Sequence, residues 1–497
     1  MTHIFEEIQL SCPFWRYCEA FEKKEHVFML DSSKTADQLG LFSFIGAEPF
    51  LLFTAKRHNS SGQQSEATIQ EIIYKTPEGC FYPEPIEKTY SGDPIEALRQ
   101  LMQSYDVPHF QESSVPLKGG AIGYFSYEAG YFIEEMPDLG SDDLMLPDIY
   151  FGFYDVLLCY DHDNQQAFLS VTGRGAKEFS ARQAEQLQEE AIAQIRRFEA
   201  RLPQTLPPID HSYLPDVHFK SHFEKAAYGE LIQTCLEHIG RGDVYEICLT
   251  HRLEADYEGD GWHLYQNLRH INPAPFSCYL RFPETEVICS SPERFLKLDE
   301  HRVAESRPIK GTRPRGSTPE EDLWLIDDLG HSEKDRAENV MIVDLIRNDL
   351  GRVCEVGSVH VPDLFVVEQY ATVFQLVSTI RGKLKKELDA LDLIKATFPG
   401  GSMTGAPKIE AMKIIDRLEP VKRGIYSGAI GYLSFDGKMD FNIAIRTIVL
   451  QNEICYFNVG GAVVADSDPE AEYQETLDKA VALKKAIRLA HALQNVK

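Results

Sequence analysis

The sequence has 497 residues and a formal net charge of −27 at pH 7, with ten cysteines scattered without a Cys-x-x-Cys pair. The acidic balance argues against nucleic acid or a membrane surface as a partner, and an anionic substrate would need a local cation. Single cysteines, no apolar run of membrane length and no signal-peptide pattern at the start favour a cytoplasmic protein. The length predicts two domains or one large composite domain.

The N-terminal part combines short β-like runs, such as 150–160, with a long charged helix over about 176–200. A proline-rich stretch at 201–216 then predicts a linker. We therefore expect an N-terminal domain at 1–200 and a C-terminal domain at 217–497. After the linker we predict a helix over 222–241 and strands over 286–298 and 366–384. Because strands and helices do not alternate regularly, we expect an α+β fold of antiparallel sheets packed together with helices outside.

One eight-residue segment, Gly120–Tyr127, recurs as Gly428–Phe435 with six identical positions. The echo indicates either two related sheet units or a chance likeness between glycine-rich strand starts.

The segment Arg307–Gly316 sets Lys310 between a Pro-Ile pair and a Gly-Thr turn, with arginines just outside. Such a basic Pro/Gly-rich loop is commonly a surface turn. In a walled pocket with positive neighbours, however, the lysine can lose its proton and act as a nucleophile or base. Gly311 would let the backbone approach an anion closely.

Two predicted helix starts carry paired carboxylates on one face. Ser332 and Asp335 fit a capping box, and Glu338 lies three residues after Asp335. The second start, with Asp468 as N-cap and Pro469 in the first turn, continues with Glu472 and Glu475. Each pair alone complements the helix dipole. If the two pairs converge, they form an oxygen-rich site that suits Mg²⁺.

Three further segments have local patterns. The loop 399–408 fails the phosphate-loop test because Gly405 is followed by Ala-Pro, so we predict a tight turn that leads into a helix near Pro407. A strand over 439–447 places Arg446 on one face beside small residues, either exposed or available to bind a carboxylate. The glycines at 460 and 461 predict a bulge or a close approach to a ligand.

In order along the chain, these pieces resemble the chorismate-utilising enzymes over roughly residues 220–490. The matching segments are Ser291–Phe295, Pro308–Thr312, Ser332–Asp349, Gly405–Lys408, Gly431–Tyr432, Ile445–Thr447 and Asp466–Glu475. Within the family, Pro-Ile-Lys-Gly-Thr around Lys310 and the segment Asn272–Ser277 are similar to aminodeoxychorismate synthases. Anthranilate synthases have Ala in place of Lys310 and His in place of Gln375. Isochorismate and salicylate synthases carry a water-activating Lys where this chain has Glu246.

The resemblance implies a mechanism in which neutral Lys310 attacks ring carbon C2 of chorismate and Glu293 protonates the departing 4-hydroxyl. Ammonia from a small glutamine amidotransferase subunit would then attack C4 and expel Lys310 from C2, which gives 4-amino-4-deoxychorismate for 4-aminobenzoate and folate synthesis. The ring carboxylate would bind Mg²⁺ held by Glu338 and Glu475, with Asp335 and Glu472 nearby. The other carboxylate would bind Arg446 and Tyr432, with backbone N–H groups completing the cradle at Gly311, Thr312, Gly460, Gly461 and Ala462.

Some members of the family hold tryptophan in the N-terminal domain. Asp31-Ser32 replaces their usual Glu-Ser here, so the sequence leaves open whether this chain binds tryptophan. Two alternatives also stay open: an anthranilate synthase large subunit that carries Lys310, and a non-catalytic ligand-binding subunit of the same fold.

Overall fold

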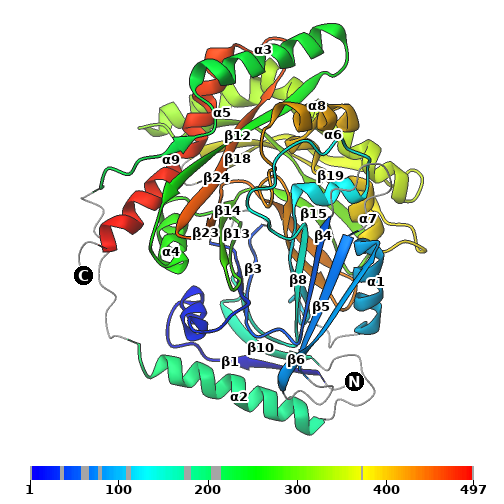
Figure 1. Ribbon diagram of the computed structural model, residues 1–497, viewed down its shortest axis with the longest axis vertical. Coiled ribbons are helices and arrows are strands. Elements are labelled where there is room, and N and C mark those ends of the chain that lie inside the picture. The colour runs from blue at the N-terminus through cyan, green and yellow to red at the C-terminus, as the bar shows by residue number, and fades with distance from the viewer. Residues whose placement is uncertain are drawn as a thin grey trace.

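The computed structural model describes residues 3–33, 39–57, 67–75, 81–107, 113–172, 181–202, 214–370 and 373–494. In these residues two large sheets lie against each other, and helices cover their outer faces (Figure 1). Every pairing between the named strands is antiparallel, which confirms the predicted α+β class.

Each sheet is described by the order of its hydrogen-bonded strands. The first sheet runs β1 (His3–Ile8), β10 (Gln166–Thr172), β9 (Val156–Asp161), β3 (Phe42–Gly46), β2 (Val27–Asp31), β13 (Phe276–Arg281), β14 (Thr285–Ser291), β23 (Thr447–Gln451), β24 (Ile454–Val463), β12 (Glu246–Asp256) and β11 (Lys220–Ser221), with β20 (Gly405–Ala406) also on β12. The second runs β17 (Ile309–Pro314), β19 (Val373–Lys383), β16 (Val303–Arg307), β15 (Arg294–Leu298), β22 (Met439–Ile443), β21 (Ala429–Ser434), β7 (Gly120–Phe125), β8 (Ile149–Tyr154), β4 (Leu51–Arg57), β5 (Ala67–Lys75) and β6 (Phe81–Gly92), with β18 (His360–Gln369) also on β19.

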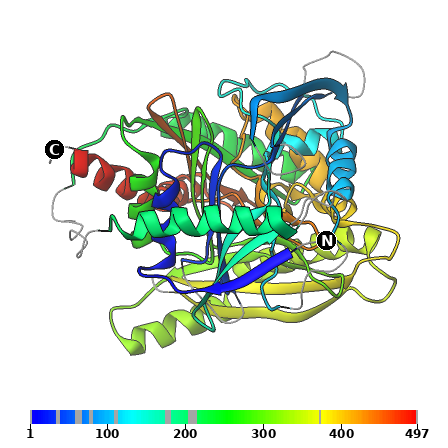
Figure 2. The same cartoon turned by 90° about the horizontal axis from the view of Figure 1, so that it is seen from below.

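The helices pack on the outer faces through apolar side chains. They are α1 (Pro94–Ser104), α2 (Ala181–Glu199), α3 (Lys225–Arg241), α4 (Gly261–Ile271), α5 (Pro319–His331), α6 (Glu333–Val353), α7 (Ala390–Thr397), α8 (Lys408–Leu418) and α9 (Pro469–Gln494), with short 3-10 turns η1 (Phe14–Phe21), η2 (Tyr127–Phe132) and η3 (Gly401–Met403). One core between the sheets includes Phe28, Tyr124 and Val287, and separate cores lie under the helices of each outer face. Seen from below, α2 lies across the edge formed by β1 and β10 (Figure 2).

The repeated segment forms two neighbouring strands, β7 and β21, whose register is symmetric about Gly123 opposite Gly431. A Cβ on Gly123 would lie 1.8 Å from Tyr150 O, and one on Gly431 would lie 2.1 Å from Asp440 O. Both glycines therefore let β7 approach β8 and β21 approach β22 closely, which gives the repeated segment a structural role.

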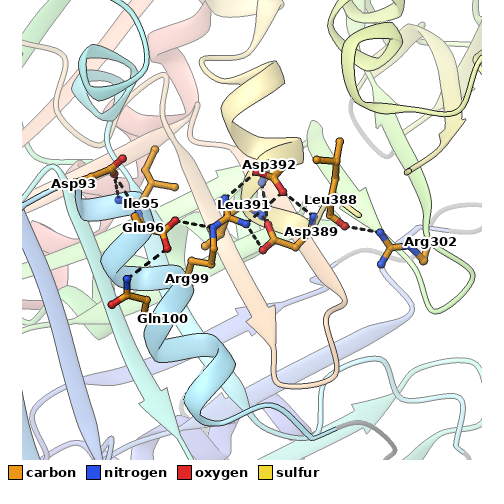
Figure 3. Close-up of polar contacts among 10 residues, drawn as sticks. All are labelled: Asp93, Ile95, Glu96, Arg99, Gln100, Arg302, Leu388, Asp389, Leu391 and Asp392. Atoms are coloured by element: carbon orange, nitrogen blue, oxygen red, sulfur yellow. Dashed lines mark hydrogen bonds and ion pairs between the residues drawn. The ribbon is translucent and has the colours of Figure 1, made fainter. Parts of the chain in front are cut away.

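Strands from both sides of the predicted linker share both sheets, for example in the β2–β13 and β7–β21 pairs. Most of the linker, 203–213, lies outside the described residues, so the division at 201–216 stays a prediction. The halves also meet through helices: Arg99 of α1 forms ion pairs with Asp389 and Asp392 at the start of α7 (Figure 3). Within the described part of the chain, no helix is both long and apolar enough to cross a bilayer.

Candidate active site

Two chain segments that pass from one sheet to the other lie side by side. Between β14 and β15 the chain crosses at Pro292-Glu293, and between β22 and β23 it crosses at 444–446. Ile443 N donates to Glu293 O at 3.0 Å, and Ser290 N donates to Arg446 O at 3.1 Å. The backbone thus fixes Glu293 and Arg446 relative to each other.

A cavity of about 800 Å³ opens beside these crossings. It brings together most of the predicted site residues, namely Glu293, Lys310, Gly311, Thr312, Asp335, Glu338, Arg446, Gly460, Gly461, Ala462 and Glu475. Glu472 adjoins the cavity, because its Oε2 lies 3.0 Å from the position of a Cβ on Gly461. Among the predicted residues, Tyr432 lies elsewhere.

Lys310 is buried in this cavity, where its Nζ donates to Glu246 Oε1 at 2.6 Å and lies 3.9 Å from Glu338 Oε2. Burial alone lowers the pKa of Lys310, but these two carboxylates outweigh it and hold the pKa above the ordinary lysine value. The expected neutral lysine with positive neighbours is therefore wrong for the resting protein. The nearby Arg313 and Arg315 are paired with aspartates, whereas carboxylates from other elements surround Lys310.

Glu293 is buried, and burial raises its pKa to about 7. The Ser402 hydroxyl, which donates to Glu293 Oε1 at 2.8 Å, and the Lys310 charge lower the pKa in part. A carboxyl group with a pKa near 7 can be protonated at neutral pH, as a general acid requires.

The predicted carboxylate pairs on α6 and α9 lie at the same cavity. Glu338 Oε1 and Glu472 Oε2 are buried without a hydrogen-bond partner, and Glu475 lines the same cavity. Burial raises the pKa of Glu338 to about 7. Asp335 pairs with Arg313 at 3.0 Å, so it is already partly neutralised. No three acidic, histidine or cysteine side chains of the described residues are already arranged around a metal position. Unpartnered carboxylate oxygens nonetheless fit Mg²⁺, which uses few carboxylates and keeps water ligands.

Arg446 does not lie on a strand, because β22 ends at Ile443 and the chain leaves the second sheet there. The predicted strand over 439–447 is thus wrong at its end, and Arg446 has a positive φ of 49° in the crossing. Among the described residues its side chain makes one hydrogen bond, to Asn272 Oδ1 at 3.2 Å, and no ion pair. Its guanidinium is therefore available to an anion in the cavity.

Tyr432 does not share this cavity, which corrects its predicted pairing with Arg446. Its ring lies in the core between the sheets, at 5.9 Å from that of Phe44, beside a second pocket that also contains Asp31. Tyr426 lines the cavity instead. Ser427 N donates to Ala444 O at 2.9 Å, which brings Tyr426 to the Arg446 crossing. The local sequence before β21 contains no pattern that predicts this contact.

The two glycines of β24 do not form a bulge, because the pairing with β12 continues in register from Ile454 to Val463. Gly460 leaves no room for a side chain, since a Cβ would lie 2.3 Å from Leu249 O. At Gly461 a side chain would meet Glu472 and Glu475. The two glycines therefore allow neighbouring groups to approach the β24 backbone closely, and they do not form a bulge.

Several cavity residues were not among the predicted site residues. Lys479 Nζ donates to Gly460 O at 2.8 Å and pairs with Glu475 at 2.7 Å. Lys334 lies 3.9 Å from Glu472 and 4.0 Å from Glu338. Gln375, noted earlier as a family difference, lines the cavity with its Oε1 buried and unpartnered.

Comparison with known proteins places this fold in a class. A crystal structure of anthranilate synthase component I from Streptococcus pneumoniae matches with a TM-score of 0.74 and 30% identity, over 91% of this chain and 93% of that one. The fold is thus that of an enzyme class that includes anthranilate synthase component I. Residues 48–485 match the family described as chorismate binding enzyme, and the chain belongs to this family.

Two curated relatives have aminodeoxychorismate synthase names. Aminodeoxychorismate synthase component 1 of Escherichia coli is 42% identical over 391 residues, 79% of this chain and 82% of that protein. Aminodeoxychorismate synthase of Streptomyces pristinaespiralis is 41% identical over 470 residues, 94% of this chain. The match spans 62% of the Streptomyces protein's length.

Proposed function

We propose that this chain aminates chorismate at C4 to give 4-amino-4-deoxychorismate, as an aminodeoxychorismate synthase component I. The observation that carries the proposal is that Lys310 and Glu293 open into one cavity together with Gln375. A nucleophile and an acid suit displacement of the 4-hydroxyl, and glutamine cannot act as the acid–base group for eliminating pyruvate. The names of the relatives from Escherichia coli and Streptomyces pristinaespiralis support the same reading.

In the proposed reaction, Lys310 first gives a proton to Glu246, whose Oε1 is 2.6 Å away. The Nζ–C2 bond forms while the ring double bonds shift and the C4–O bond breaks. Glu293 protonates the departing hydroxyl, which leaves as water. Ammonia then forms the N–C4 bond, the double bonds return, and the Nζ–C2 bond breaks. The new ammonium group gives a proton to Glu293, and Glu246 returns its proton to Lys310. The covalent step divides one difficult displacement into two easier ones.

Substrate binding follows from the charges of the cavity. Arg446, without an ion pair among the described residues, would bind the enolpyruvyl carboxylate, and Tyr426 lines the same cavity. Backbone N–H groups at Gly311–Thr312 and Gly460–Ala462 would complete the anion cradle. Glu338, Glu472 and Glu475 would hold Mg²⁺, with Asp335 nearby. When bound, the ion would offset the charge of the ring carboxylate against these acidic groups.

The ammonia would come from a glutamine amidotransferase subunit, and the product would serve 4-aminobenzoate and folate synthesis in the cytoplasm. The nine cysteines of the described residues are all free, as a reducing compartment would keep them.

The test is mass spectrometry of products from purified protein with chorismate, Mg²⁺ and ammonium. We expect aminodeoxychorismate without anthranilate or pyruvate, and loss of product by at least roughly a thousandfold in Lys310→Ala, because the covalent route is lost. Anthranilate with pyruvate would instead support anthranilate synthase. No chorismate consumption, with ammonium or with a glutaminase added, would support the non-catalytic alternative.

A further inference from the structure

The loop 399–408 connects α7 to α8 and is fixed on both sides. Gly405 and Ala406 pair with Ile247 and Glu246 of β12. Cys248 N donates to Thr404 O at 2.8 Å, and the buried Arg423 donates to Met403 O at 2.7 Å. These bonds hold the middle of the loop at the wall of the cavity.

The loop cannot bind phosphate in the way its glycines first suggest. Met403 N and Thr404 N donate to carbonyl oxygens within the loop, at Gly400 and Gly401. A Cβ on Gly400 would lie 2.5 Å from Ile443, and one on Gly401 would lie 2.5 Å from Leu345. The loop is therefore packed tightly against β22 and α6, and its glycines serve this contact.

Ser402 lies at the centre of this fixed loop and lines the cavity. Its Oγ donates to Glu293 Oε1 at 2.8 Å. On the other side, the backbone of Glu293 is held by Ile443 N and by the Ser291 hydroxyl. We propose that Ser402 is a positioning residue that occupies Oε1 of Glu293 and so leaves Oε2 to carry the transferred proton. This inference rests on the proposed function, in which Glu293 is the general acid.

The charged groups around Glu293 come from three other elements. Lys310 on β17 and Lys479 on α9 both favour the ionised carboxylate. Asp349 on α6 lines the small pocket behind Glu293, but Lys408 binds it at 2.6 Å. The hydroxyl of Ser402 and the backbone N–H of Ile309 also favour the ionised form, and among the described residues Ser402 is the one whose side chain hydrogen-bonds the Glu293 carboxylate. Its removal should therefore change both orientation and protonation.

The kinetic test compares Ser402→Ala with Ser402→Thr, which keeps a hydroxyl. We expect kcat for aminodeoxychorismate to fall roughly tenfold in the alanine variant with KM little changed, because proton transfer is affected and binding is not. Without the Ser402 hydroxyl as donor, the Glu293 carboxyl keeps its proton to higher pH. The alkaline limb of the kcat/KM profile should therefore shift to higher pH. The threonine variant should recover most of the rate. Ser434→Ala, outside the cavity, is the matched control.

A second readout does not depend on turnover. Infrared difference spectra between the protein and Glu293→Gln identify the protonated carboxyl band of Glu293, and its titration midpoint is then measured in each variant. We expect a higher midpoint in Ser402→Ala and recovery in Ser402→Thr. If the wild-type protein forms no aminodeoxychorismate but this midpoint shifts, the proposed function fails and the positioning role stands. An unshifted midpoint with unchanged kcat would overturn the positioning role.

Discussion

At the scale of single residues, Lys310 is held between two sheets. It projects from β17 of the second sheet, and its partner Glu246 begins β12 of the first. Glu246 Oε2 is buried without a hydrogen-bond partner, so this second oxygen of the carboxylate remains available as an acceptor. In the proposed reaction, a single proton transfer from the Lys310 cation to Glu246 would give the neutral amine without exchange with solvent.

Arg446 gives a prediction about substrate binding. Arg446→Ala should raise the Kd for chorismate by roughly ten- to a hundredfold, because a charge-assisted, bidentate contact with a carboxylate is lost. Arg446→Lys should recover only part of the affinity for chorismate, since a lysine ammonium cannot form the bidentate contact of a guanidinium group. Isothermal titration calorimetry with chorismate and Mg²⁺ measures the effect. Arg347→Ala, an exposed arginine of α6, is the control. Equal affinity in Arg446→Ala would place the substrate carboxylate elsewhere.

The unpartnered carboxylate oxygens of Glu338 and Glu472 give a prediction about Mg²⁺. At a concentration on the order of 100 times its Kd, Mg²⁺ should add about 2–3 kcal/mol to the free energy of unfolding. Glu338→Gln and Glu472→Gln should reduce this gain, because each removes a buried acceptor oxygen. Glu333→Gln, an exposed acid of the same helix as Glu338, should keep it. Thermal unfolding with and without Mg²⁺ measures the gain, and equal gains in all four proteins would exclude this site.

At the scale of elements, helix starts could be predicted because their signals are local. Ser332 accepts from Asp335 N at the start of α6, and Asp468 accepts from Ala471 N at the start of α9, as the sequence indicates. The crossing at 444–446 could not be predicted, because an apolar pattern does not tell which of two sheets a strand joins. The sequence therefore identifies Arg446 as a site residue but assigns it to a strand, whereas it lies in the crossing between the sheets.

The environments of the site residues depend on contacts far apart in the sequence. Glu246 lies 64 residues from Lys310, and no local pattern connects them. The exchange of Tyr432 for Tyr426 has the same origin. Tyr432 lies within β21 and Tyr426 just before it, and the bond from Ser427 N to Ala444 O brings Tyr426 to the Arg446 crossing.

The contact between α1 and α7 gives a prediction about stability. Asp389 and Asp392 form a capping box that starts α7, and Arg99 of α1 bridges both carboxylates (Figure 3). Arg99→Ala should lower the free energy of unfolding by about 1 kcal/mol, a modest value because both aspartates are partly exposed. Arg99→Lys should lose less, and chorismate turnover should not change. Urea unfolding measures the loss, and a wild-type midpoint would show that the bridge contributes nothing.

At the scale of the whole molecule, the two halves of the chain are joined by buried polar contacts as well as by shared sheets. Glu128 of η2 accepts from Arg423 N at 2.9 Å and from Gly424 N at 3.0 Å, across nearly 300 residues. Arg423 in turn donates to Cys248 O and Met403 O, both at the cavity wall. The packing of the halves therefore supports the geometry of the site.

Glu128 also predicts how stability depends on pH. Burial raises its pKa from 4.5 to about 7, so the folded protein binds this proton more tightly than the unfolded chain. The resulting stabilisation is complete below pH 4.5 and is lost as pH rises to about 7. Between pH 5 and pH 8, this one group should lower the free energy of unfolding by about 2–3 kcal/mol.

The measurement is urea unfolding of the wild-type protein and of Glu128→Gln at both pH values. The variant cannot release this proton, so its loss of stability from pH 5 to pH 8 should be smaller by that amount. Glu135→Gln, an exposed glutamate seven residues away, should behave as the wild type. If the wild type and Glu128→Gln lose stability equally, the charge of Glu128 is offset in the folded protein, and the rise in net negative charge must account for the pH dependence.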